Sequence, residues 1–206
     1  MCAILGKPVF WHIFAMTAFS TAGGVFLLNN IKACVNQYFD DMFLNTAAAI
    51  GLLCSHLSRG LWGALYSQRF LGFKRTYLTL LVLQMGFGCT LPEVIDQRAA
   101  FLVWTVVLLS CLGGQVVVFS RVCSLNFGVK FFIIYTGVFA GSAIAAVLNV
   151  FVDRGISYKQ ALLSLHALNG ISIVLLAFYK YRENMQWHTK TYAEYAEEHR
   201  DTISTY

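Results

Sequence analysis

The residue with the most direct chemical consequence is Arg59, which lies inside the apolar stretch 44–66. A charged side chain within a membrane-spanning segment costs at least about 2.5–3.5 kcal/mol, so it is by default a candidate functional residue. All ten acidic residues lie outside the apolar stretches, which leaves Arg59 without an acidic partner within them. A guanidinium binds carboxylates through charge-assisted hydrogen bonds. The sequence therefore predicts a site for a carboxylate-bearing solute, and the alternative is that Arg59 snorkels to the lipid headgroups.

Two polar residues precede Arg59 at helical spacing. Ser55 lies four residues before it and His56 three residues before it, and such positions share one face of an α-helix. We therefore expect Ser55 and His56 to complete a polar pocket around Arg59. His56 could also couple proton movement to an anion, because histidine titrates near neutral pH. The alternative for His56 is a hydrogen bond between helices.

Five further polar residues lie in apolar stretches, and for most of them we expect hydrogen bonds between helices. They are Gln84, Gln115, Asn149, His166 and Asn169. We find no Ser/His/Asp set, paired carboxylates or Gly-rich phosphate loop within these stretches, and no cysteine or histidine spacing typical of a metal site. The sequence therefore predicts neither an enzyme nor a protein that holds a cofactor.

The elements that must position these residues follow from composition. Of the 206 residues, 58% are hydrophobic and only 12% are charged, and the mean hydropathy is +0.63. Soluble domains contain about 25% charged residues, so these values exclude an ordinary soluble domain. The apolar residues form blocks separated by short polar loops. We predict an all-α polytopic membrane protein.

A helix needs about 20 mainly apolar residues to cross the hydrocarbon core, and six blocks are about that long. We place the spans at 9–31, 44–66, 76–92, 99–120, 130–152 and 160–180, within a transmembrane domain 1–182. Residues 183–206 form a polar cytoplasmic tail whose pattern is consistent with a short helix.

The basic residues predict the orientation of these spans. Ten of the fifteen Lys and Arg residues fall on the side of the N-terminus, four fall on the other side, and Arg59 lies within a span. The positive-inside rule therefore places both termini in the cytoplasm, or on the equivalent inner side of an organelle membrane. Because topology explains the charge, nucleic acid is not an expected partner.

The segment 58–75 joins the second and third spans with a small-Arg pair, a glycine one turn later and a basic, glycine-containing loop. Three other segments carry family-like motifs. They are the small-residue run 22–24 before an Asn pair, the Gly-Gly, Phe and Phe-Gly-x-Lys run from 113 to 130, and the runs Tyr-Thr-Gly at 135–137 and Gly-Ser-Ala at 141–143. Taken together, the chain resembles the carboxyl-terminal half of the major facilitator superfamily, and within it the oxalate/formate antiporter and nodulin-like families.

This resemblance implies six helices organised as two inverted three-helix repeats, which form half of a twelve-helix transporter. It implies that Tyr135 and Thr136 line the substrate cavity. It also implies a gating loop, formed by Gly63, Gln68, Arg69, Gly72, Lys74 and Arg75. Gln68 stands where the family carries an acid that helps to hold the gate closed.

Two functions remain open at this point. The first is transport of a small organic anion by alternating access together with a partner half. The resemblance favours a monocarboxylate, because some dicarboxylate carriers of the family have a second cation midway along the fifth span, and here no basic residue follows Lys130 before Arg154. The partner would be a second six-helix half, a second copy of the chain or a larger membrane complex. The second function is that of a diverged carrier half acting as a structural membrane subunit of such a complex.

Overall fold

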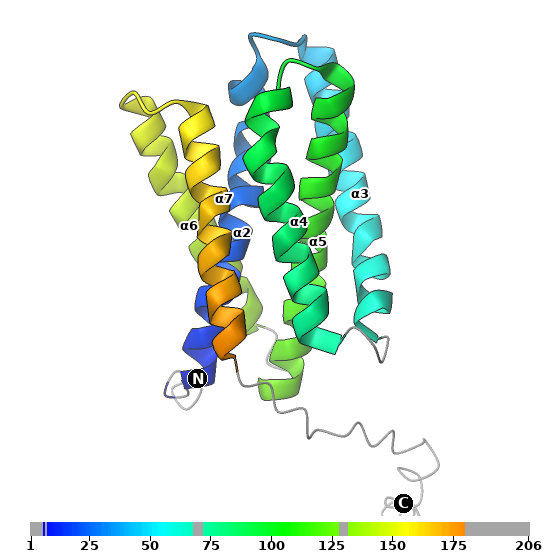
Figure 1. Ribbon diagram of the computed structural model, residues 1–206, viewed down its shortest axis with the longest axis vertical. Helices are drawn as coiled ribbons and strands as arrows, with labels where there is room; N and C mark the ends of the chain where they lie inside the picture. The colour runs from blue at the N-terminus through cyan, green and yellow to red at the C-terminus, as the bar shows by residue number, and fades with distance from the viewer. Residues whose placement is uncertain (1–5, 7, 68–71, 128–131, 180–206) are drawn as a thin grey trace, which may run out of the picture.

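The computed structural model describes residues 6, 8–67, 72–127 and 132–179, and in these residues it is built entirely from α-helices joined by short turns (Figure 1). The helices are α2 (Pro8–Val35), α3 (Asp41–Ser67), α4 (Gly72–Val94), α5 (Arg98–Phe127), α6 (Phe132–Asp153) and α7 (Tyr158–Phe178). Each overlaps one of the predicted spans. Four helices, α2 to α5, extend beyond their spans, whereas the predicted spans 130–152 and 160–180 pass the described bounds of α6 and α7 by two residues each. The predicted tail 183–206 lies outside the described residues.

Five of these helices, α2, α4, α5, α6 and α7, are long and apolar enough to cross a membrane. This confirms the prediction of an integral, multi-pass membrane protein. The exception is α3, which has 27 residues and therefore ample length. Asn45, His56 and Arg59 lower its mean hydropathy, so membrane crossing by α3 stays a prediction.

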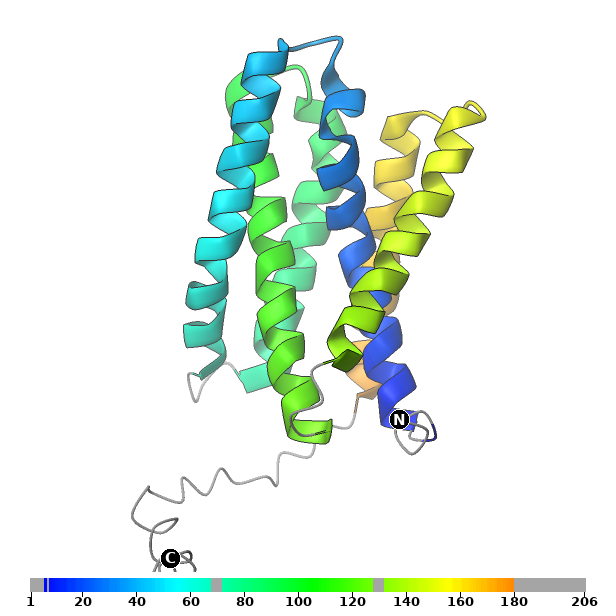
Figure 2. The same cartoon turned by 180° about the vertical axis from the view of Figure 1, so that it is seen from behind.

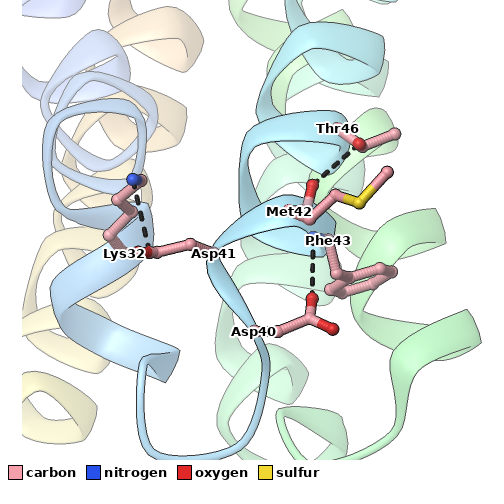
Figure 3. A network of polar contacts seen from close by, with 6 residues as sticks. All are labelled: Lys32, Asp40, Asp41, Met42, Phe43 and Thr46. Atoms are coloured by element: carbon pink, nitrogen blue, oxygen red, sulfur yellow. Dashed lines mark hydrogen bonds and ion pairs between the residues drawn. The ribbon is translucent and has the colours of Figure 1, made fainter.

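Local signals define where two of the helices, α3 and α7, begin. Asp40 precedes α3 and its carboxylate Oδ1 accepts a hydrogen bond from the backbone N–H of Phe43 at 2.8 Å (Figure 3). A capping box begins α7: the Ser157 hydroxyl accepts from the backbone N–H of Gln160, whose side chain accepts from the backbone of Ser157. Gly155, with a φ of +112°, turns the chain between α6 and α7. Asp40 and the Ser157–Gln160 box thus satisfy backbone N–H groups that the helix starts leave unpaired.

The helices alternate in direction, and their packing repeats itself (Figures 1 and 2). The extensive pairs are α3 with α5, α2 with α6, α2 with α7, α4 with α5, and α4 with α7. If α2 is exchanged with α5, α3 with α6 and α4 with α7, the same five pairs result. The helices α2 to α4 therefore make the same set of contacts as the helices α5 to α7. Because each group has three antiparallel helices, the two groups run in opposite directions.

Glycines let α5 approach α3 closely and let α6 approach α2 closely. On α5, a Cβ at Gly113 would overlap the Ser55 carbonyl oxygen and lie 2.9 Å from the Ser58 hydroxyl of α3. On α6, a Cβ at Gly141 would lie 2.9 Å from the Ala18 carbonyl oxygen of α2. The four-residue spacing of Gly137 and Gly141 therefore allows α6 to pack closely against α2.

The two ends of the bundle differ in charge. At the end we call the ion-pair end, three exposed ion pairs join neighbouring elements. They are Lys32–Asp41 at 3.4 Å (Figure 3), Arg98–Asp40 at 3.6 Å and Lys159–Glu93 at 2.8 Å. Exposed pairs of this kind contribute about 0–1 kcal/mol each. At the opposite, basic end, the described charged residues are Lys74, Arg75 and Arg121.

Candidate functional site

Ser55 lies in the contact between α3 and α5. Its side chain is buried, and Gly113 of α5 packs directly against it. One turn further along α3, the Ser58 hydroxyl lies 2.9 Å from the Ser55 carbonyl oxygen and 3.0 Å from the Ser110 carbonyl oxygen of α5. Ser55 and Ser58 therefore contribute to a polar, closely packed helix contact.

His56 and Arg59 lie at the edge of this contact. The His56 side chain is exposed, and Arg59 is partly buried. The Arg59 Nε atom is buried and has no hydrogen-bond partner among the described residues. Within the same residues, no hydrogen bond joins Arg59 to Ser55 or His56. The three residues therefore lie within about one turn of α3, but their surroundings differ. Ser55 is buried against α5, whereas the His56 side chain is exposed.

The remaining predicted site residues are only partly described. Thr136 is partly buried on α6, next to Gly137, which packs against Thr17 of α2. The side chain of Tyr135 lies outside the described residues, so a cavity lined by Tyr135 and Thr136 stays a prediction.

The predicted gating loop spans the end of α3 and the start of α4. Gly63 of α3 faces Val117 of α5, to which an added Cβ would lie 3.5 Å away. Gly72 begins α4 with a φ of +54°, a backbone conformation that glycine adopts readily. Lys74 and Arg75 follow in the first turn and are exposed. Gln68 and Arg69 lie outside the described residues.

A second group of buried polar residues lies inside the bundle, where α2, α4, α5 and α7 meet. The Gln84 amide of α4 donates to the Ser20 carbonyl oxygen of α2 at 2.8 Å, and the Gln115 amide of α5 donates to the Gln84 side-chain oxygen. Nearby, the Met16 carbonyl oxygen accepts from Tyr77 and from Ser172, both at 3.1 Å. The prediction of hydrogen bonds between helices is confirmed for Gln84 and Gln115.

His166 and Asn169 belong to the same level of the bundle but make no such bonds. Both are fully buried on α7, and their side-chain nitrogen and oxygen atoms have no hydrogen-bond partner among the described residues. The His166 ring packs between Gly23 of α2 and Gly88 of α4, where a Cβ on either glycine would overlap it. The sequence showed the polar residues of this group, but the glycines that admit the imidazole follow only from the fold.

The described residues hold no group of three His, Cys, Asp or Glu side chains that could bind a metal ion. Arg59 combines a charge and partial burial with a buried Nε atom that has no hydrogen-bond partner among the described residues. The N–H of a buried guanidinium nitrogen without a partner can donate a charge-assisted hydrogen bond to an anion.

Comparison of the chain with protein-family models and with curated proteins gives no match. The resemblance to the major facilitator superfamily therefore stays a proposal that depends on the motifs and on the arrangement of the helices.

Proposed function

We propose that the chain is a transporter-like six-helix half that binds a small organic anion, with a monocarboxylate as the preferred solute. The observation that carries this proposal is Arg59, which is partly buried on α3 with its Nε atom buried and unpaired in the described structure. The described acids, Asp40, Asp41, Glu93, Asp96 and Asp153, lie at the ion-pair end. A solute carboxylate would provide the negative charge that the described residues around Arg59 do not provide.

The packing of the helices supports the architecture of this proposal. Two groups of three helices, which run in opposite directions and make equivalent contacts, correspond to the inverted repeats on which many transporters are built. In such proteins the substrate lies near the interface between repeated units, and alternating access comes from their relative movement. The proposal therefore includes membrane crossing by α3 as the sixth span.

The surface of α3 supports a partner for this half. Outside its contact with α5, the helix exposes large apolar side chains such as Leu53, Leu57 and Leu61, together with the polar ring of His56. A purely lipid-facing surface rarely carries an ionisable side chain in the middle of a span. A second six-helix half, provided by another chain or by a second copy, would cover both kinds of residue.

The exposed apolar faces of α3 and α6 favour a second candidate function. A diverged carrier half could use the exposed faces of α3 and α6 to hold neighbouring subunits of a larger membrane complex. On α6 these faces include Phe139, of which 68% is exposed, and Val147. The structural-subunit function requires the apolar faces but makes no use of the Arg59 charge.

A transport measurement separates the two functions. The purified protein is reconstituted into liposomes, and uptake of radiolabelled formate, lactate and oxalate is measured for the wild type, Arg59→Gln and Arg154→Gln. Arg154 is exposed in the turn after α6 and provides a matched loss of charge. We expect uptake of at least one monocarboxylate that Arg59→Gln abolishes and Arg154→Gln retains. Equal background uptake in all three proteins would contradict transport with a second copy of the chain as the partner half and would favour the structural-subunit function.

A further inference from the structure

The His166 side chain lies in a slot between two neighbouring helices. It belongs to α7, which packs against α2 and α4 (Figure 1), and it is fully buried. A Cβ on Gly23 of α2 would lie 2.8 Å from the ring, and a Cβ on Gly88 of α4 would overlap it. Because α2 and α4 belong to one three-helix group and α7 belongs to the other, the ring lies in the contact between the two groups.

The polar atoms of this ring are unpaired in the slot. Both Nδ1 and Nε2 are buried and have no hydrogen-bond partner among the described residues. Asn169 lies three residues further along α7, and the Oδ1 and Nδ2 atoms of its buried side chain are unpaired in the same way. Burial removes these atoms from water without giving them a hydrogen bond, which is unfavourable. An aliphatic side chain would fill the slot at lower free energy, so packing alone gives no reason for an imidazole at this position.

The ionisable groups around the slot determine what protonation of the ring would do. On α4, Cys89 adjoins Gly88 and carries a thiol rather than a carboxylate. Glu93 lies five residues beyond Gly88, roughly 8 Å along the helix axis, is exposed and pairs with Lys159 of α7 at 2.8 Å.

The other described ionisable side chains of α7 and of the helices packed against it lie in the terminal two turns of their helices. They are His12, Lys32 and Cys34 of α2, Lys74, Arg75 and Tyr77 of α4, Asp153 of α6 and Tyr158 of α7. Among the described residues, the ring therefore has neither a hydrogen-bond acceptor nor a carboxylate in contact with it.

We propose that His166 is a proton-binding site that controls the contact between the two three-helix groups. The neutral ring fits the slot between Gly23 and Gly88. A proton from solution gives both ring nitrogens an N–H and gives the ring a positive charge, which a fully buried slot without acceptors stabilises poorly. Proton binding therefore favours a state in which α7 moves away from the two glycines and the ring reaches water. Loss of the proton restores the described packing.

The direction of the pH effect follows from the number of protons that each state binds. An imidazole that is accessible to water has a pKa of about 6.5. Below that pH, the open or unfolded state binds one proton more than the described packing does. The stability of the packing is therefore fully present above about pH 6.5 and is lost as the pH falls. Each further pH unit shifts the ratio of the two states about tenfold toward the protonated one.

Unfolding of the purified full-length protein by SDS in mixed micelles at pH 8 and pH 5 tests the proposal. The variants are His166→Leu, which keeps a side chain in the slot without a titratable group, and His56→Gln, which removes an exposed imidazole of α3. Between the two pH values, we expect the ratio of unfolded to folded wild type to rise about ten- to thirtyfold more than that of His166→Leu. His56→Gln should respond as the wild type does.

The variant Arg59→Gln separates this inference from the proposed anion site. Proton binding by His166 does not require the guanidinium, so Arg59→Gln should keep the pH response of the wild type whether or not a carboxylate binds. A pH response that disappears in Arg59→Gln but persists in His166→Leu would overturn the assignment to His166.

Hydrogen–deuterium exchange of the wild type tests the same inference without a substitution in the slot. After correction for the intrinsic effect of pH on exchange, the backbone amides of α7 around His166 should exchange faster at pH 5 than at pH 8. Those of α3, which packs mainly against α5, should change less. The proposal is overturned if the corrected exchange of α7 is the same at both pH values, or if His166→Leu loses stability with falling pH as the wild type does.

Discussion

At the scale of single residues, Gln84 joins three helices through its side chain. Its amide donates to the Ser20 carbonyl oxygen of α2, and its oxygen accepts from Gln115 of α5. Both groups are fully buried. A buried polar group that has lost its hydrogen-bond partner is still removed from water, and that desolvation is unfavourable. Replacing only one of the two glutamines by an apolar residue should therefore destabilise the protein more than replacing both.

We predict that Gln84→Leu lowers the free energy of unfolding by about 1–3 kcal/mol, because it leaves the Gln115 amide unpaired. The double variant Gln84→Leu/Gln115→Leu should be more stable than Gln84→Leu alone, because it removes that orphaned amide. Unfolding by SDS in mixed micelles measures both effects. Gln97→Leu, at an exposed turn position, serves as a control with a change close to zero. Additive losses in the double variant would contradict this explanation.

The sequence predicted which single residues carry polar chemistry but could not predict their surroundings. Arg59, Ser55 and His56 were expected to form one pocket because their spacing places them near one helix face. The packing of α5 through Gly113 takes Ser55 out of that surface and leaves His56 exposed. Whether a residue on a helix meets solute, lipid or another helix depends on contacts that are distant in sequence.

At the scale of elements, the α3–α5 contact depends on glycine. The absence of a side chain at Gly113 lets the Ser55 backbone approach, and the same approach brings Ser58 within 3.0 Å of the Ser110 carbonyl oxygen. Gly86 on α4 is also helical, but a Cβ there would meet no atom within 4 Å. The two glycines therefore offer a matched comparison of the same substitution.

We predict that Gly113→Ala destabilises the protein by about 1–3 kcal/mol, because the new methyl group overlaps the Ser55 backbone. Gly86→Ala should leave stability unchanged or raise it by up to about 1 kcal/mol, because alanine favours the helix. The two unfolding curves are measured under the same conditions. Equal stability of the two variants would show that α3 and α5 do not pack as closely as described.

The positions of the helices along the chain were largely predictable from the sequence, but the residues at which they begin and end were not. Each predicted span lies on one helix, because long apolar stretches bounded by polar residues specify little else. The helices continue beyond several spans; α5, for example, ends at Phe127 rather than near residue 120. Polar residues such as Arg121 end an apolar stretch without ending the helix, and Arg121 donates to Ser67 of α3 at 3.0 Å. Hydropathy locates the membrane core but not the interfacial turns.

At the scale of the whole molecule, the charge distribution and the helix count together determine topology. Among the described residues, the charged side chains at the basic end are all cations, whereas the ion-pair end carries both signs. We propose that the basic end faces the cytoplasm, as the positive-inside rule requires. If α3 crosses the membrane, six spans place both termini on that side; five spans would place them on opposite sides.

We predict that epitope tags placed before Met1 and after Tyr206 are both protected in intact bacterial spheroplasts and both become accessible after permeabilisation. A tag inserted after Gln97, in the turn between α4 and α5, should be accessible without permeabilisation. Antibody labelling of the three tagged proteins measures this topology. Accessibility of only one terminus in intact spheroplasts would indicate an odd number of spans and would exclude α3 as the sixth.

The central claim is that Arg59 forms an anion site, and ligand-dependent thermal stability of the purified protein in detergent tests it most directly. A series of small monocarboxylates and dicarboxylates is added to the wild type, to Arg59→Gln and to the charge-matched control Arg154→Gln. A ligand that binds only the folded protein raises its stability. We predict that at least one monocarboxylate stabilises the wild type and Arg154→Gln but not Arg59→Gln. The claim is contradicted if no carboxylate stabilises the wild type, or if Arg59→Gln responds to the same solute equally.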